Sequence, residues 1–163
     1  MAQPEKISLD KAKKDKLFYF VANVVVYRES DGRCLILKRD EREIAHPGLY
    51  GVIGGKMEWN SMPIDTPSRV NGDVLDYLDT VENLLTREAK EEANIAIFPE
   101  LCYINSLSFI RPDEVPVVLV KFCARYKSGE IVLEKGAFTE FAWVNEEEAV
   151  SYTHLTLPTN REV

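Results

Sequence analysis

Hydrophobic and polar residues alternate in short segments of the chain, which is the pattern of β-strands with one buried face. Six segments are expected to form strands: 17–29, 34–38, 49–53, 101–110, 115–126 and 138–144. Asp31-Gly32 joins the first two as a hairpin turn, because both residue types tolerate positive φ. Turns of charged residues, proline and glycine separate the later strands, so the strands are expected to form a mixed sheet.

Over residues 80–93, the apolar residues recur with the spacing of an α-helix instead of a strand. At about 100° per residue, the stripe expected to face the core holds Val81, Leu84, Leu85, Ala89 and Ala93. Asn83, Thr86 and Lys90 fall on the opposite, water-facing side. Asp79 or Thr80 is expected to cap this helix, with Glu82 completing a capping box, and Asn94 to end it in the left-handed conformation. A second helix is expected from near Asn145.

Strands and helices in this order predict one α/β (α+β) domain over residues 17–150, after a polar lead-in over 1–16. Residues 59–78 contain two prolines, Asn71-Gly72 and few apolar residues before Val74, so they are expected to form a surface loop or lid. Residues 151–163 break the pattern of the last helix. We interpret this tail as translated sequencing-adapter read-through, which implies a longer natural protein, and we assign no function to His154.

Composition narrows the class of protein. The 163 residues carry 20 Lys and Arg against 27 Asp and Glu, a net charge of −7, which disfavours a binder of nucleic-acid polymers. No apolar run approaches the roughly 20 residues of a membrane span, and the polar N-terminus lacks a signal-peptide core, so a cytoplasmic protein is expected. Cys34, Cys102 and Cys123 lie far apart in apolar runs and are expected to be reduced structural thiols.

Two glutamates of the 80–93 helix lie on its apolar side. Glu88 and Glu92 fall within about 20° of Val81, and Glu91 lies at the border of the stripe. Glutamates are rarely buried without a partner, and three carboxylates at this spacing repel one another. Arg87 offsets only part of that charge, so a hard divalent cation, Mg²⁺ or Mn²⁺, is expected to bind them.

Gly54-Gly55-Lys56-Met57-Glu58 follows an apolar strand upstream of this helix. Glycine lets backbone carbonyls approach a metal, and Lys56 can meet a phosphate. The sequence contains neither G-x-x-x-x-G-K-[ST] nor G-x-G-x-x-G, so neither common nucleotide-binding loop accounts for these glycines.

These residues resemble the box of the Nudix hydrolase family, G-x5-E-x7-R-E-U-x-E-E-x-G-U, where U is bulky and apolar. Its second half stands here as Arg87-Glu88-Ala89-Lys90-Glu91-Glu92-Ala93-Asn94-Ile95, and Gly55 begins the first half. The two halves fit only if the 18 residues 60–77 are inserted between them. Asp79 stands for Glu, Ala89 for a bulky residue and Asn94 for Gly.

The resemblance covers roughly residues 18–150 and implies an α/β/α sandwich. It also implies Mg²⁺-dependent hydrolysis of a nucleoside diphosphate linked to another group, with Mn²⁺ able to substitute. Glu88, Glu91 and Glu92 would ligate the metal, with the Gly55 carbonyl. Glu88 or Glu92 would act as general base, and Arg87 would orient the carboxylates.

Several further residues are candidates for contact with substrate or metal. The candidates for substrate binding are Lys56, Arg39, Tyr50, Arg69 and Glu134. Glu134 and Glu140 are also candidate metal ligands or bases, although each is more simply a surface acid. His46 is expected to shape its loop, and Phe109 to stack on a base or to join the core. The insertion 60–77 is expected to have both ends beside the metal and to act as a lid or specificity element.

The substrate stays open among an oxidised nucleoside triphosphate, ADP-ribose and a nucleotide sugar. The partner is therefore a small nucleotide, with no nucleic-acid polymer and no membrane, and a homodimer is compatible with the sequence. The alternative function is a non-catalytic nucleotide-sensing module on the same fold.

Overall fold

The computed structural model describes residues 7–152. Most of the expected tail, 153–163, and the first six residues of the lead-in lie outside this range, as does His154. The strands are β1 (Tyr19–Tyr27), β2 (Cys34–Arg39), β3 (Tyr50–Gly51), β4 (Ile53–Lys56), β5 (Arg69–Asn71), β6 (Val74–Asp76), β7 (Ala96–Ile97), β8 (Cys102–Ile110), β9 (Pro116–Ser128) and β10 (Phe138–Val144). The α-helices are α1 (Thr80–Ala93) and α2 (Glu146–Tyr152), and the short 3₁₀ helices are η1 (Lys14–Lys16) and η2 (Trp59–Ser61).

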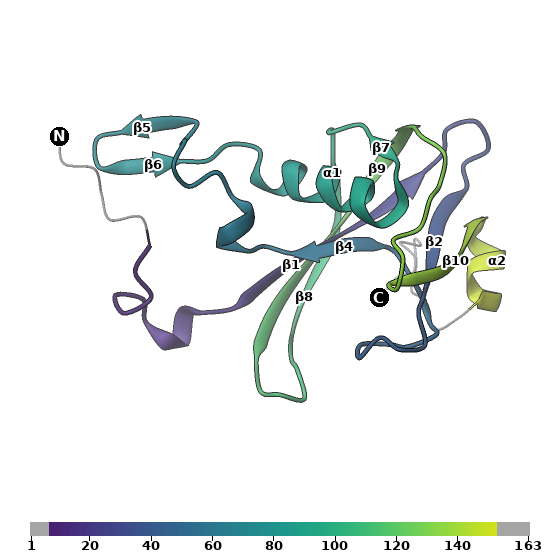
Figure 1. The fold of residues 1–163 in the computed structure, drawn as a ribbon, viewed down its shortest axis with the longest axis horizontal. Helices are drawn as coiled ribbons and strands as arrows, with labels where there is room; N and C mark the ends of the chain where they lie inside the picture. Colours follow the sequence, from purple (N-terminus) through teal and green to yellow (C-terminus); the bar gives the residue numbers. More distant parts are fainter. Residues whose placement is uncertain (1–6, 153–163) are drawn as a thin grey trace.

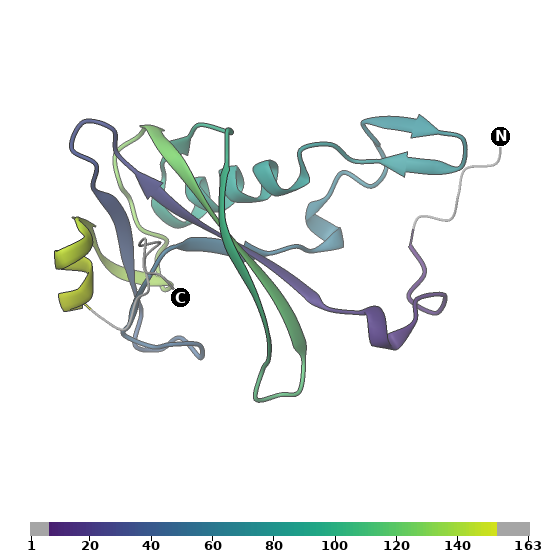
Figure 2. The same ribbon diagram turned by 180° about the vertical axis from the view of Figure 1, so that it is seen from behind.

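The main sheet is mixed, as predicted. Its strand order is β10-β2-β1-β9-β7, with β3 paired to β2, β4 to β1 and β8 to β9. The central pair β1 and β9 is parallel, because the chain between these strands crosses over through α1 (Figure 1). The long β8–β9 hairpin extends beyond the rest of the sheet (Figure 2).

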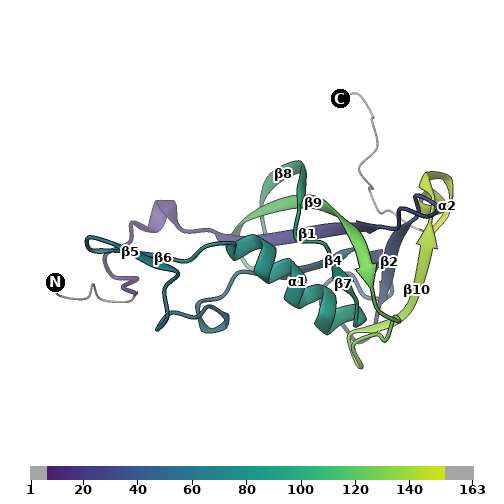
Figure 3. The ribbon, with the colours of Figure 1, turned by 90° about the horizontal axis from the view of Figure 1, so that it is seen from above.

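The two faces of β1 pack against different helices. Val24 belongs to a buried cluster that includes Leu85 and Ala89 of α1. The next residue, Val25, belongs to a second cluster with Ala149 of α2. Since successive side chains of a strand point to opposite faces, α1 and α2 cover opposite faces, which gives the α/β/α layering (Figure 3).

The long helix follows the sequence prediction except at its start. Its bounds, its buried stripe and the left-handed Asn94 (φ 57°) are as expected. The predicted capping box is wrong: Asp79 is itself left-handed (φ 54°), and its side chain makes no capping hydrogen bond. A side-chain cap requires an extended backbone at that position. The Thr80 hydroxyl donates instead to the Tyr77 carbonyl, at 2.8 Å.

A reciprocal cap forms at the second helix instead. The Glu148 N–H donates to Asn145 Oδ1 at 2.8 Å, and the Asn145 N–H donates to Glu148 Oε2 at 3.0 Å. This arrangement satisfies two backbone groups at once and explains why α2 begins directly after Asn145.

The strand expected over 49–53 is divided into β3 and β4, and Gly54 and Gly55 lie inside β4, not in a turn after it. The expected surface loop contains η2 and the small β5–β6 hairpin, at the opposite end of the molecule from α2 (Figure 1). No helix within residues 7–152 is long and apolar enough to cross a membrane.

Candidate functional site

The site begins where α1 lies against the glycines of β4. A Cβ added to Gly55 would lie 2.5 Å from the Glu88 carboxyl carbon, and one added to Gly54 would lie 2.7 Å from the Ala22 carbonyl oxygen. Both distances are shorter than real Cβ contacts, so a side chain at Gly54 would clash with the backbone, and one at Gly55 would displace the Glu88 carboxylate. Gly55 therefore lies directly against Glu88 of α1, whereas Gly54 lies close to Ala22 and Asn23 of β1.

Glu92 is the most deeply held carboxylate of this face. Its Oε2 accepts a hydrogen bond from the Gly54 N–H at 3.3 Å. Burial, and then the nearby charge of Glu88, raise the pKa of Glu92 to about 8. The pKa shows how poorly this negative charge is compensated by the protein alone.

Glu88 lies beside Glu92 with a side chain that is 15% exposed. Burial raises its pKa, and the Arg87 guanidinium, which donates to Glu88 Oε1 at 3.0 Å, partly opposes that shift. Arg87 also lies 3.7 Å from Glu91. One arginine thus contacts two of the three glutamates of the pattern.

Glu91 is more exposed than the other two carboxylates. Its side chain is 56% exposed, and it does not line the cavity described below. Within residues 7–152, no three His, Cys, Asp or Glu side chains stand close enough together to form a preformed metal site. The structure does bring together the carboxylates of Glu88 and Glu92 beside Gly54-Gly55, and carboxylate oxygen atoms suit Mg²⁺.

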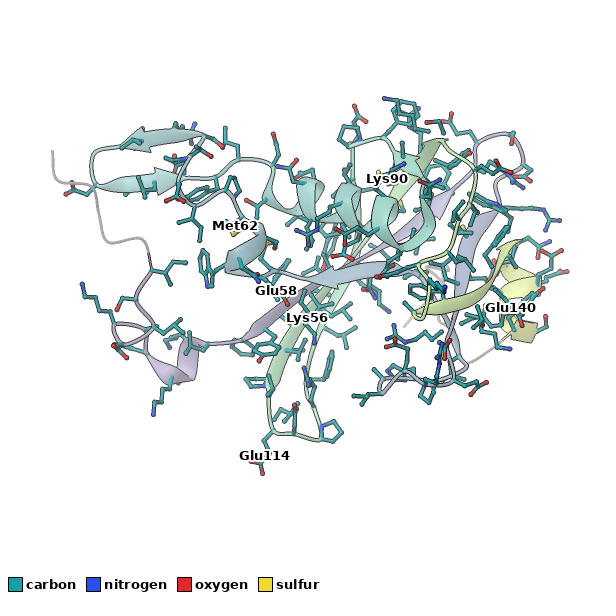
Figure 4. All side chains as sticks on the ribbon, viewed as in Figure 1. Lys56, Glu58, Met62, Lys90, Glu114 and Glu140 are labelled. Carbon is teal, nitrogen blue, oxygen red and sulfur yellow. The ribbon has the colours of Figure 1, made fainter. Side chains whose placement is uncertain are left out.

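The carboxylates open into a cavity of about 780 Å³. Its wall contains basic and imidazole groups from five parts of the chain: Arg39, His46, Lys56, Arg87 and Lys121. Figure 4 shows Lys56 and Glu58 together on the side of β4 away from α1. Lys90 lies on α1, on the side of the helix away from β4. The cavity thus combines paired acids with a basic wall, which suits an anionic ligand bound through a cation.

Arg39, the last residue of β2, and His46, in the loop after it, both line this cavity. Arg39 donates to the Ala45 carbonyl at 2.7 Å and to Glu43 at 3.2 Å. Its positive charge also acts to lower the pKa of Glu92. His46 is held in the left-handed conformation, with φ 51°. The expectation that His46 shapes its loop agrees with this conformation.

Tyr50 lines the cavity, but its hydroxyl donates to Glu140 Oε2 at 2.7 Å. Burial and this hydrogen bond raise the pKa of Tyr50 to about 12. Glu140 in turn accepts from Lys38 at 3.3 Å and does not line the cavity. Glu134 does not line it either, although its charge helps to raise the pKa of both Glu88 and Glu92.

Two other candidates are not brought to the cavity. Arg69 pairs with Asp76 at 2.5 Å within the β5–β6 hairpin, and Phe109 lies exposed on β8. Neither end of 60–77 lines the carboxylate cavity. Tyr77 and Met62 line a neighbouring cavity of about 270 Å³, and Arg87 lines both cavities. That the insertion has both ends beside the metal stays a prediction.

The sequence analysis did not identify Lys121. It lies in the middle of β9 within no recognisable motif, and it enters the cavity wall because parallel pairing sets it opposite Asn23 of β1. Only the sheet topology could have revealed it.

No protein-family model matches the sequence, and no curated protein matches it. Solved structures do resemble it. A MutT NUDIX hydrolase from Burkholderia pseudomallei is 22% identical with a TM-score of 0.58, over 78% of this chain and 83% of that one. The NUDIX domain of Shewanella oneidensis NrtR, complexed with ADP ribose, is 13% identical with a TM-score of 0.62, over 89% of this chain and 85% of that one. A C. elegans Ap4A hydrolase is 19% identical with a TM-score of 0.54, over 82% of this chain and 85% of that one. The chain therefore has the Nudix fold, as the sequence resemblance predicted.

Proposed function

We propose that this protein is a hydrolase that cleaves a phosphoanhydride bond in a nucleoside diphosphate derivative and depends on Mg²⁺ or Mn²⁺. The observation that carries the proposal is the pair Glu88 and Glu92, held against Gly54-Gly55 at one side of a basic cavity. The protein alone does not neutralise this pair, since the pKa of each carboxyl is raised. A divalent cation would supply the missing charge.

The residues that would hold the cation are Glu88 and Glu92, with the Gly55 carbonyl and with Glu91 after a change of rotamer. When bound, such a cation neutralises a diphosphate and lowers the pKa of a coordinated water. Arg87 would keep Glu88 in place through its 3.0 Å hydrogen bond. Glu88 or Glu92 would act as the general base, since a bound cation favours the ionised form of both carboxylates.

The cavity wall supports a nucleotide as the substrate. Its volume of about 780 Å³ lies within the range of small-molecule sites, roughly 300–1,000 Å³. Arg39, Lys56 and Lys121 would contact phosphate oxygens, and the aromatic ring of Tyr50 provides a face for a base. The basic lining explains how a protein of net charge −7 can accept an anion.

Solved structures with a similar fold differ in the nucleotide named with them. The NrtR domain was solved with ADP ribose, and the C. elegans protein is named as an Ap4A hydrolase. We therefore propose a substrate panel of an oxidised nucleoside triphosphate, ADP-ribose, a diadenosine polyphosphate and a nucleotide sugar.

The test measures phosphate or nucleotide release on metal-stripped protein, before and after addition of Mg²⁺ or Mn²⁺. Turnover of at least one compound that returns with metal supports the hydrolase. Turnover unchanged in excess chelator would overturn the metal dependence. Tight binding of a nucleotide without turnover would instead support the sensing module.

A further inference from the structure

The cysteines have an arrangement that their distant sequence positions conceal. All three are free thiols. Cys102 and Cys123 are direct partners across the antiparallel β8–β9 pair. Direct partners in an antiparallel pair point to the same face of the sheet, with Cβ atoms about 4.5–5.5 Å apart. Their Cα separation, about 4.5–5.5 Å, falls within the range that a disulfide spans.

The two thiols already interact. Burial, and then the neighbouring Cys102 thiol, raise the pKa of the Cys123 thiol, in agreement with a short distance between the two groups. The pairing places one sulfur next to the other without a change of strand register. In a disulfide, the two Cβ atoms are typically about 3.5–4.5 Å apart. The two Cβ atoms therefore need to move only slightly closer for the bond to form.

The two cysteines differ in their access to solvent. Cys102 is exposed on β8, which pairs with β9 along one side. Cys123 is half-buried and packs in the apolar cluster that contains Val25 and Ile36. A small oxidant can therefore reach Cys102 first, and Cys123 is positioned to react with the oxidised product.

Cys34 is the competing partner, but the sheet holds it too far away. It lies on β2, and β1 separates that strand from β9. Two strand spacings of about 4.8 Å separate the backbones by roughly 9–10 Å. Cysteines whose Cα atoms are more than about 7 Å apart cannot be bridged without backbone movement. The register therefore selects Cys102 and not Cys34 as the partner of Cys123.

We propose that Cys102 and Cys123 are a reversible dithiol site that hydrogen peroxide oxidises to an intramolecular disulfide across β8 and β9. The Cys102 sulfur attacks one peroxide oxygen, the O–O bond breaks, and a sulfenic acid and one water form. The Cys123 sulfur then attacks the sulfenic sulfur, the S–S bond forms, and a second water leaves. The two thiols together lose two electrons and two protons, which reduce the peroxide to two waters.

The new bond would form beside the cavity. Lys121 lies two residues before Cys123, on the same face of β9, and lines the cavity wall. The site is distinct from the carboxylates of α1 and does not depend on the proposed hydrolysis.

The test treats the folded, full-length protein with hydrogen peroxide, blocks remaining thiols with an alkylating agent and measures intact mass and peptide maps. We expect one disulfide between Cys102 and Cys123, a mass loss of about 2 Da before alkylation, and restoration by dithiothreitol. Cys34→Ser should form the same bond. Cys102→Ser and Cys123→Ser should form no intramolecular disulfide.

Three results would overturn the proposal: three thiols that remain fully alkylated, a disulfide that includes Cys34, or oxidation of Cys102 that stops at the sulfinic acid. Matched circular dichroism spectra of the four proteins show whether each variant is folded. If Cys123→Ser does not fold, Cys123→Ala provides the second variant at that position.

Discussion

Glu92 combines two properties that an ordinary surface glutamate lacks. It is held by the Gly54 N–H, and its pKa is raised to about 8. Glu92→Gln keeps the shape of the side chain and removes the charge. We expect kcat to fall by on the order of 10²-fold or more, as when a stabiliser of the transition state is removed.

Steady-state kinetics at saturating Mg²⁺ measure this effect. The matched control is Glu82→Gln, on the same helix but outside the cavity lining. A kcat within two-fold of the parent for Glu92→Gln would show that Glu92 is structural.

Lys121 should act on binding more than on the chemical step. It lines the cavity from β9, on a different element from the carboxylates. Lys121→Met keeps the aliphatic stem and removes the charge. We expect KM to rise about five- to ten-fold, the loss of roughly one charged hydrogen bond, with kcat changed much less.

Lys127→Met is the control for Lys121, because Lys127 lies on the same strand near the Phe98 ring and outside the cavity. Equal KM values for the parent and Lys121→Met, measured for every compound that is turned over, would exclude Lys121 from substrate binding.

At the scale of elements, the contact between β4 and α1 determines the site. Gly55→Ala would place a Cβ against the Glu88 carboxyl group. Since α1 is fixed by its buried stripe, we expect Glu88 to rotate out of place and the affinity for Mn²⁺ to fall about ten-fold or more, with the fold retained. Gly51→Ala is the control, because an added Cβ there meets no atom within 4 Å. Titration of Mn²⁺ measures both, and equal affinities would contradict the proposed role of this contact.

We expect the β5–β6 hairpin to be dispensable for activity. None of its residues lines the cavity, and Arg69 is paired with Asp76. Replacing residues 69–76 by a short Gly-Ser link should cost on the order of 1 kcal/mol and leave kcat/KM within two-fold for each substrate. A change of substrate preference would restore the lid hypothesis for this segment.

Helices and strands in which apolar residues recur regularly were predictable from the sequence, whereas contacts between elements were not. The helix over 80–93 and its buried stripe follow directly from the spacing of Leu84, Leu85 and Ala89. The same angles correctly predicted that Glu88 lies on the buried side. Glu91 lies at the border of the stripe, where a few degrees decide exposure, and here it is exposed.

The remaining features depend on distant pairing. The two-residue strands β3 and β7 are too short to show a period. The position of Lys121 depends on the pairing of β9 with β1, and the Cys102–Cys123 pair depends on the pairing of β9 with β8. The failure of the Asp79 cap shows the same limit, because the local sequence does not reveal the left-handed backbone at that residue.

At the scale of the whole molecule, stability should depend on pH through the uncompensated carboxylates. The pKa of Glu92 is raised in the folded state, to about 8 from an ordinary value of 4.5. The folded protein therefore binds more protons than the unfolded chain between these pH values, and the free energy of unfolding falls as pH rises through this range. The stabilising effect of the proton is complete below about pH 4.5 and is lost above about pH 8.

A bound cation should reverse this dependence, because it favours the ionised carboxylates and binds only the folded state. We expect the Tm of metal-free protein to fall between pH 5.5 and 8.5, and Mg²⁺ to raise Tm most at the higher pH. Glu92→Gln should show a flatter pH dependence without metal and a higher Tm than the parent at pH 8.5, since the buried charge is gone. Calorimetry of both proteins, with EDTA or with Mg²⁺, measures all four curves. If the metal-free parent and Glu92→Gln have parallel Tm curves over this range, the Glu92 carboxylate is not the group that couples folding to pH. If Mg²⁺ shifts neither curve, the carboxylate pair does not bind the cation that the proposed hydrolysis requires.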